Sequence, residues 1–392
     1  MILLTAFSTL SLNMFLPSLA SIAEDFDASY ATVSLAVGGY LAVTAIVQLI
    51  VGPMSDQIGR RPVLLGALVL FTLASIGCAV TSSIWTFLAF RMLQGGIISG
   101  YALALAIVRD TNSERKAAGL IGYISMSMAI APMLGPVLGG VLDTAFGWRA
   151  NFYFYAISGI VLLVLCWIDL GETKPRNEPG TSVEPEQFVD LLREPLFWAV
   201  SLCSATSIGA FYIFLTGAPL VAQTQFGAST AEIGFFLGTI TAGFFCGAFI
   251  SARFAPRFHP TTMMLAGRLV ACLGLTAGAT AIYLTEPSPT LFFGSTVFVG
   301  LGNGITTPSS NAAAVSVRPK LAGSAAGLNG ALVVALGAIL TTGVGSVLPA
   351  TEPALPLMLF MLTASVTGFL CVLIAIYLSR LKPSGSTELQ SR

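Results

Sequence analysis

Long apolar runs alternate with short polar breaks along almost the whole chain. Each run is about 20 residues long, the length of an α-helix that crosses roughly 30 Å of hydrocarbon. The breaks carry charges or clusters of Pro, Gly, Asn and Ser, which end helices. The pattern predicts twelve membrane-spanning helices, at 2–22, 32–54, 62–81, 85–107, 117–141, 150–169, 196–217, 231–252, 261–284, 289–312, 323–347 and 356–379. The first run has neither a basic segment before it nor an A-x-A cleavage site, so we expect a retained helix rather than a signal peptide.

One polar stretch is much longer than the others. Residues 170–195 contain the Pro-rich sequence GETKPRNEPGTSVEPEQ and separate two sets of six predicted spans. Two halves of similar length indicate a parallel internal repeat, with the binding site expected where the halves meet. We therefore predict an all-α membrane protein with a six-helix bundle at 1–169, a linker at 170–195, a second six-helix bundle at 196–379 and a tail at 380–392.

Positive charges divide unequally between the two sides of the predicted topology. If the amino terminus is cytoplasmic, the loops on the other side carry only Arg149 among basic residues, together with several acids. Lys and Arg concentrate in cytoplasmic loops, so both termini are predicted to be cytoplasmic. The loops and tail on that side hold Arg60, Arg61, Arg109, Arg115, Lys116, Lys174, Arg176, Arg193, Arg253, Arg257, Arg318, Lys320, Arg380, Lys382 and Arg392.

Composition agrees with a membrane protein and excludes several other classes. Hydrophobic residues make up 55% of the chain and charged residues 9%, whereas soluble domains carry about 25% charged residues. The net charge of zero gives no reason to expect a nucleic-acid partner. No GxxxxGK[ST], GxSxG or HExxH motif is present, so we expect neither an enzyme nor an ATP-driven pump, and no cofactor or metal. The six cysteines lie in apolar runs without a CxxC and are expected to be core residues.

The loop between the second and third spans reads GPMSDQIGRRP and combines glycines with charges. Glycines permit a tight turn between two helix ends. A carboxylate beside two guanidinium groups can form an ion pair that holds one conformation and releases in another. The alternative is a solvated basic turn. The candidate gating residues of this loop are Gly52, Asp56, Gly59, Arg60 and Arg61.

Two arginines lie inside predicted spans. Arg91 in the fourth span is followed one turn later by Gln94 and Gly95. A charge deep in a membrane helix costs several kcal/mol unless it is paired or hydrated, so such a residue is a functional candidate. The alternative is that the side chain extends to the interface, because Arg91 is about six residues from the predicted end of its span. For Arg268 in the ninth span, we favour this second interpretation.

Small residues recur in the fifth span, in the sequence APMLGPVLGG. Small residues at four-residue spacing let another helix approach closely, and proline bends a helix. Packing is the interpretation that the residues themselves support. The residues concerned are Gly135, Pro136, Gly139 and Gly140.

These three patterns together resemble the major facilitator superfamily. The loop resembles its signature between spans 2 and 3, the segment around Arg91 its span-4 motif, and the fifth span the antiporter motif of drug exporters. Weaker matches resemble the Bcr/CflA branch, which includes bicyclomycin and chloramphenicol exporters. They are Asn13-Met14-Phe15-Leu16-Pro17, Arg109-Asp110, Gly147-Trp148-Arg149, Ser309-Ser310-Asn311-Ala312 and Ala322-Gly323-Ser324-Ala325.

The resemblance implies a secondary-active exporter of small amphipathic drugs or metabolites in the bacterial inner membrane. It would work by alternating access, driven by the proton gradient. Arg91 would line a central cavity and couple substrate to ions, and Arg109 and Asp110 would join the gate. The chain departs from the family at Gln57, at Ala131 and above all at Asn13, where the branch usually carries an aspartate. An asparagine cannot titrate, so proton antiport lacks its expected carrier, and facilitated export or another coupling group remain alternatives.

Met and aromatic side chains supply adaptable surface for a lipophilic guest. The substrate-binding candidates are Met14, Tyr123, Met126, Phe211, Tyr212 and Phe214, with Asn311 as a polar contact, although each could instead face lipid or another helix. We expect a monomer whose partners are the bilayer and a small amphipathic substrate. A nutrient importer of the same fold and a non-transporting membrane sensor or scaffold are the alternatives.

Overall fold

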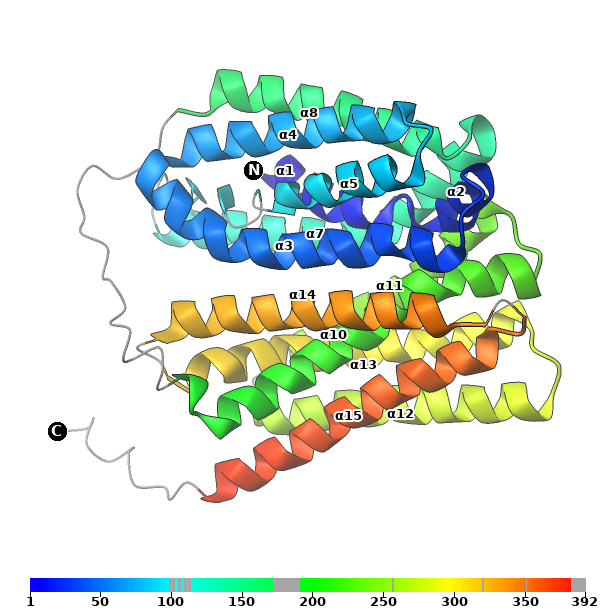
Figure 1. Ribbon diagram of the computed structural model, residues 1–392. Helices are drawn as coiled ribbons and strands as arrows, with labels where there is room; N and C mark the ends of the chain where they lie inside the picture. Colours follow the sequence, from blue (N-terminus) through cyan, green and yellow to red (C-terminus); the bar gives the residue numbers. More distant parts are fainter. Residues whose placement is uncertain are drawn as a thin grey trace.

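The computed structural model describes residues 1–98, 100, 103–104, 107–108, 111, 114–171, 191–255, 257–318, 321–349 and 351–381. Every regular element in this part of the chain is helical. Figure 1 shows two bundles lying side by side, one built by the first half of the chain and one by the second.

The first bundle contains the helices that precede the linker. They are α1 (Ile2–Asn13), η1 (Leu16–Ser18), α2 (Leu19–Asp25), α3 (Tyr30–Ile58), α4 (Arg60–Val80), α5 (Ile84–Gln94), η2 (Gly95–Ile98), α7 (Glu114–Phe146) and α8 (Arg149–Asp169). The second bundle contains α10 (Pro195–Leu220), the π-helical turn η3 (Val221–Gln225), α11 (Thr230–Phe254), α12 (Pro260–Leu284), α13 (Pro289–Ser316), α14 (Ala322–Val347) and α15 (Ala354–Leu381).

Most helices follow the predicted spans closely. The fourth span, predicted at 85–107, is described only in part, with α5 ending at Gln94 and the 3₁₀ turn η2 following it. The predicted linker at 170–195 lies mostly outside the described residues. The fifth span was predicted to end at residue 141 and ends at Phe146, one of the larger differences. The first span is interrupted, because a 3₁₀ turn at Leu16–Ser18 separates α1 from α2. Pro17 lies in this turn and has no backbone N–H for a helical hydrogen bond. Within the described residues, nine helices are long and apolar enough to cross a membrane.

Local sequence explains where several helices begin and turn. Ser29 caps α3 by accepting a hydrogen bond from the Thr32 backbone N–H. Ser229 and Glu232 form a reciprocal capping box at the start of α11. Gly59 joins α3 to α4 with φ +115°, a conformation that other residues rarely adopt. The sharp turn at Gly59 agrees with the tight turn expected from the loop glycines.

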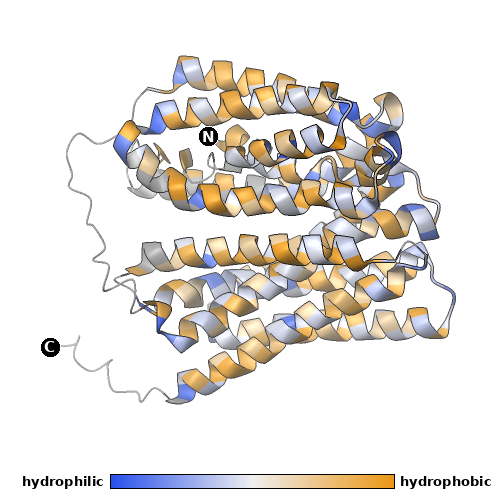
Figure 2. Cartoon of the chain, viewed as in Figure 1, coloured by the Kyte–Doolittle hydropathy of each residue, from blue (hydrophilic) through white to orange (hydrophobic). Residues whose placement is uncertain are grey.

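The molecule has two chemically different ends. Figure 2 shows apolar residues along the helices and hydrophilic residues at their ends. We call the end at which α3 ends and α4 begins the basic end; the basic residues of the described segments there are Arg60, Arg61, Arg115, Lys116, Arg193, Arg253, Arg257, Arg318 and Arg380. The opposite, acidic end carries Glu24, Asp25, Asp27, Glu286 and Glu352, together with Arg149. The helix directions thus group these residues as the predicted topology requires, while the side of the membrane that each end faces stays a prediction.

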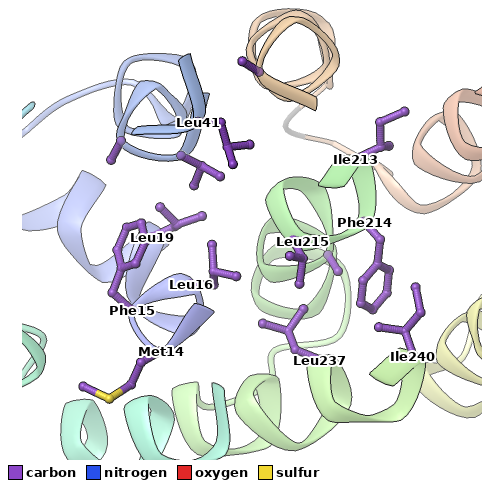
Figure 3. Close-up of a cluster of buried hydrophobic side chains, with 14 of the residues drawn as sticks. Met14, Phe15, Leu16, Leu19, Leu41, Ile213, Phe214, Leu215, Leu237 and Ile240 are labelled. Carbon is purple, nitrogen blue, oxygen red and sulfur yellow. The ribbon is translucent and has the colours of Figure 1, made fainter. Parts of the chain in front are cut away.

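The two bundles contact each other chiefly along two helix pairs, with smaller contacts of η1 with α10 and α11 and of α2 with α10. Helix α3 packs against α14, and α7 packs against α11. One apolar cluster continues from the first bundle into the second, and Figure 3 shows Leu16, Leu19 and Leu41 facing Leu215 and Leu237. Two smaller apolar clusters lie nearer the basic end, each within one half; they contain Leu191, Phe197 and Val372 in one case and Ala104, Val108 and Ile124 in the other. The core shared by the two halves therefore lies toward the acidic end.

Hydrogen bonds also join the halves at the acidic end. The Tyr30 hydroxyl donates to the Thr216 carbonyl oxygen. The hydroxyl oxygens of Thr144 and Thr230 are 2.9 Å apart. Gln223 donates to Glu24 over 2.9 Å. Polar and apolar contacts together close this end of the interface.

One expectation about the cysteines is wrong. Cys246 is exposed on α11 and Cys272 is only half-buried, although both lie in apolar runs. A membrane helix is apolar all round, so its hydrophobicity does not reveal which face packs against protein.

Candidate transport site

Arg91 is the best-defined candidate in the first bundle. Its side chain has no exposed surface. Nη1 donates to Gln94 Oε1 over 2.7 Å, and Nη2 donates to the Ser11 carbonyl oxygen over 2.9 Å. These bonds join α5 to α1 in the interior of the bundle.

Two aromatic rings enclose the same guanidinium group. Its carbon lies 4.1 Å from the ring centroid of Phe15 and 4.3 Å from that of Tyr40. The Tyr40 hydroxyl is 2.9 Å from Ser11 Oγ. A planar cation between two ring faces gains both electrostatic attraction and close packing.

A further hydrogen bond extends this network to α4. Gln94 Nε2 donates to Ser75 Oγ over 2.7 Å. The Nε atom of Arg91 has no hydrogen-bond partner among the described residues. The expectation that Arg91 lines a cavity is wrong for this conformation, and so is the alternative that it extends to the interface. It is a buried cation surrounded by uncharged groups of α1, α3, α4 and α5.

Asn13 lies close in sequence to the partners of Arg91 but has different neighbours. It is 3% exposed, and its amide donates to the Thr9 carbonyl oxygen over 2.8 Å. Its Oδ1 has no partner among the described residues. A Cβ added to Gly135 on α7 would lie 3.5 Å from Asn13 Cβ. Asn13 therefore faces α7, whereas the guanidinium group lies against Ser11 and Phe15.

The small residues of the fifth span allow close packing on two sides. A Cβ at Gly139 would overlap the Met14 carbonyl oxygen, and one at Gly140 would overlap that of Thr230. In return, a Cβ at Gly234 on α11 would overlap the Pro136 carbonyl oxygen. The packing interpretation is confirmed, and it includes contact between the two halves.

The proposed gate is only partly described. Arg60 Nη1 donates to Ser55 Oγ over 2.6 Å. Arg61 donates to the Trp167 carbonyl oxygen over 2.9 Å, and its guanidinium carbon lies 5.4 Å from the Trp167 ring centroid. These contacts attach the start of α4 to the end of α8 in the same bundle. Arg109, Asp110 and the surroundings of Gly52 and Asp56 lie outside the described residues, so the gate stays a prediction.

The substrate-binding candidates divide into three groups. Met14 and Phe214 are fully buried in the shared apolar cluster, and Figure 3 shows both. Phe211 and Tyr212 are half-buried, and Asn311 is exposed and accepts a hydrogen bond from Asn329 over 2.9 Å. The side chains of Tyr123 and Met126 lie outside the described residues. A cavity of about 410 Å³ lies elsewhere, between α3 and α4, lined by Val47, Ile50, Val51, Met54, Ile58, Pro62, Val63, Gly66, Ala67, Leu70 and Gly96.

The second bundle contains a centre that sequence reasoning missed. Arg268 has no exposed surface, so the expectation that it extends to the interface is wrong. Its Nη2 donates to Asn303 Oδ1 over 2.6 Å and its Nε to Thr306 Oγ1 over 3.1 Å. Asn303 in turn donates to the Ser207 carbonyl oxygen over 2.9 Å, which joins α12, α13 and α10. Polar Asn303 and Thr306 inside a membrane span were the signal that could have pointed to a buried partner.

Residues 1–342 match the family described as the Major Facilitator Superfamily. The chain belongs to this superfamily. Its members are transporters, so the chain is a multi-pass membrane transporter and not an enzyme.

Three relatives are similar over most of their length. The MFS-type transporter YdgK of Bacillus subtilis is 32% identical over 88% of this chain and 87% of its own. A chloramphenicol resistance protein of Pseudomonas aeruginosa is 30% identical, covering 93% and 87%, and the multidrug resistance protein MdtL of Shigella flexneri is 31% identical, covering 81% of each.

Solved structures of this superfamily share the architecture. A bacterial homolog to the human lysosomal transporter Spinster gives a TM-score of 0.75 at 18% identity, covering 97% of this chain and 95% of that one. A D-xylose-proton symporter gives 0.71 at 16% identity, covering 96% and 94%. The predicted fold of two six-helix bundles is thereby confirmed.

Proposed function

We propose that this transporter exports small amphipathic drugs or metabolites across the bacterial inner membrane by alternating access, driven by the proton gradient. Relatives named for chloramphenicol and multidrug resistance support the direction and the substrate class. The observation that carries the mechanism is the position of the shared core. The halves share apolar packing and hydrogen bonds toward the acidic end.

The charge distribution supports one orientation of this state in the membrane. If the basic end faces the cytoplasm, the structure is closed toward the outside. Opening outward would break the contacts of Tyr30 with Thr216 and of Thr144 with Thr230. It would also separate the apolar residues of η1 from those of α10. None of these described contacts is an ion pair, and the exposed hydrogen bond from Gln223 to Glu24 would break with them. Such contacts exchange readily for water, which suits an interface that opens and closes repeatedly.

Arg91 is placed to connect such a movement with the interior of the first bundle. Its guanidinium group bonds the backbone of α1 at Ser11, a few residues before Met14 and Leu16 at the interface between the halves. A shift of α1 would therefore change the surroundings of Arg91. Proton coupling needs a titratable group, and Asn13 does not supply one.

Efflux measurements test the proposed function directly. Cells that express the chain should lose preloaded chloramphenicol faster than cells with an empty vector, and an uncoupler should remove the difference. Inverted vesicles should accumulate the drug, whereas an importer would deplete them. If efflux depends equally on the proton gradient in the unmodified protein and in Asn13→Asp, a residue other than position 13 carries the proton. If efflux depends on the gradient only in Asn13→Asp, the proposal that the native protein is driven by protons is overturned.

A reversible cross-link tests alternating access. The hydroxyl oxygens of Thr144 and Thr230 are 2.9 Å apart, so the double variant Thr144→Cys, Thr230→Cys should form a disulfide. Oxidation should stop efflux because the acidic end cannot open, and a reductant should restore it. Each single variant is the matched control and should be insensitive to oxidation. Full efflux by a protein that is cross-linked throughout would contradict the mechanism.

A further inference from the structure

Among the described residues, the charged side chains with no exposed surface have one sign, while the buried acids Asp143 and Glu194 are each 8% exposed and lie near helix ends. Arg91 and Arg268 are both fully buried. In the described helices, every acid lies within three residues of a helix end: Glu24 and Asp25 in α2, Asp56 in α3, Glu114 and Asp143 in α7, Asp169 in α8 and Glu232 in α11. Glu194 precedes α10 and pairs with Arg318 at the basic end.

The two arginines lie at different depths. Arg91 is seven residues from the start of α5 at the acidic end, about 10 Å along the helix. Arg268 is eight residues from the start of α12 at the basic end, about 12 Å along the helix. The positive charge is therefore distributed over the thickness of the membrane, with one charge in each bundle.

Neither charge is neutralised by the groups that bind it. The described hydrogen-bond partners of Arg91 are an amide and a backbone carbonyl oxygen, and those of Arg268 are an amide and a hydroxyl. A guanidinium group stays protonated in proteins. Where the surrounding dielectric constant is low, its field extends to neighbouring helices with little screening. A guest between the halves would experience a positive potential from both sides.

Each centre also retains hydrogen-bonding capacity. Nε of Arg91 and Nη1 of Arg268 are buried without a partner among the described residues. The bonds of Arg268 reach α10 through Asn303 and Ser207, and Ile213 and Phe214 of α10 belong to the apolar cluster that the halves share. Helix α12 itself packs on α13 and α15, so the second charge is linked to the interface between the halves through α10 and does not lie at it.

We propose that Arg91 and Arg268 make the interior of this transporter electropositive, and that this field restricts its substrates to neutral and anionic amphipaths and excludes permanent cations. The inference rests on the proposed drug-export function and adds its charge selectivity. Arg268 then acts as a specificity-determining residue in the second half.

Two probes of the same shape and opposite charge test the proposal. Tetraphenylphosphonium and tetraphenylborate would compete with labelled chloramphenicol for the purified full-length protein in an uncharged detergent, where no membrane potential contributes. We expect tetraphenylborate to compete at least tenfold more strongly than tetraphenylphosphonium. Equal competition, or stronger competition by the cation, would overturn the charge selectivity alone. No binding of chloramphenicol or of either probe would overturn the proposed function and this inference with it.

Substitutions separate charge from geometry. Arg268→Gln should reduce the preference for the anion at least threefold, whereas Arg268→Lys keeps the charge and should retain the preference. Asn13→Asp introduces an acid at a buried position and should increase competition by tetraphenylphosphonium relative to the unmodified chain. Monodisperse elution and an unchanged helical signal would establish that each variant is folded. An unchanged preference in both folded Arg268→Gln and folded Asn13→Asp would overturn the proposal.

Discussion

The two bundles each enclose one arginine, but they hold it in different ways. Arg91 lies between the rings of Phe15 and Tyr40 and bonds the backbone of α1 directly. Arg268 has no such ring contact among the described residues, and it reaches the first helix of its half only through Asn303. In both halves a guanidinium group bonds a carboxamide, and one member of the pair bonds a carbonyl oxygen of that first helix. Arg91 bonds Ser11 directly, whereas Asn303 bonds Ser207.

The two arginines have similar hydrogen-bond connections, but their surroundings require different properties of the side chain. Two ring faces that both contact the guanidinium group select a flat cation, because an ammonium group cannot pack against both rings in the same way. Asn303 and Thr306 offer acceptors that a more flexible cation can also reach. We infer that the first centre depends on the shape of arginine and the second mainly on its charge and on close packing of α12 against α13.

The largest effect is expected where the second centre depends on close packing. A Cβ at Gly302 would overlap the Gly267 carbonyl oxygen, which lies beside Arg268 on α12. Gly302→Ala should therefore lower the stability by about 3 kcal/mol, because two backbones must separate. Thermal unfolding in detergent would measure this loss.

A matched glycine on the same helix gives the control. Nothing lies within 4 Å of a Cβ added at Gly294, so Gly294→Ala should leave the melting temperature unchanged or slightly higher. In the first centre, a Cβ at Gly95 would lie 2.9 Å from the Tyr40 carbonyl oxygen, so Gly95→Ala should fall between the two. Equal stability of Gly302→Ala and Gly294→Ala would contradict the role assigned to packing.

A smaller effect is expected when each arginine is replaced by lysine. Arg91→Lys keeps the charge but loses the planar fit between two rings and the simultaneous bonds to Ser11 and Gln94. Efflux should fall about tenfold, equivalent to about 1.4 kcal/mol. Arg268→Lys should reduce efflux less, because its partners are acceptors without ring contacts. Efflux rates, normalised to the amount of each variant in the membrane, would show which substitution reduces efflux more. A larger loss in Arg268→Lys than in Arg91→Lys would refute the proposed difference between the two centres.

The smallest effect is expected from one hydroxyl group. Tyr40→Phe keeps the ring against Arg91 and removes only the hydrogen bond to Ser11. The expected loss of stability is about 1 kcal/mol, the usual net contribution of one hydrogen bond. A melting curve of this variant beside that of Phe15→Leu would separate the hydroxyl from the ring. Loss of efflux as large as in Arg91→Lys would mean that the hydroxyl, and not the ring, holds the guanidinium group.

The helices and their order could be read from the pattern of residues. Apolar runs of about 20 residues must lie in the hydrocarbon, and charges must leave it, so the ends of α4, α8 and α12 were predicted within a few residues. The candidate at Arg91 was also visible, because one charge in an apolar run stands out. Gly139 and Gly140 were recognised as packing residues from their spacing, although their partners on other helices were not.

The surroundings of each polar residue were decided only when the helices packed together. Arg91 and Arg268 are both single charges in apolar runs, and nothing local shows whether such a side chain reaches the interface or turns inward. Packing placed the Ser11 carbonyl oxygen within hydrogen-bonding distance of Arg91, and Asn303 and Thr306 within that distance of Arg268, and it turned Asn13 toward α7 instead of toward Arg91. A membrane helix is apolar on every side, so its sequence specifies that it spans the bilayer, while the direction of each face depends on contacts with helices far away in the chain.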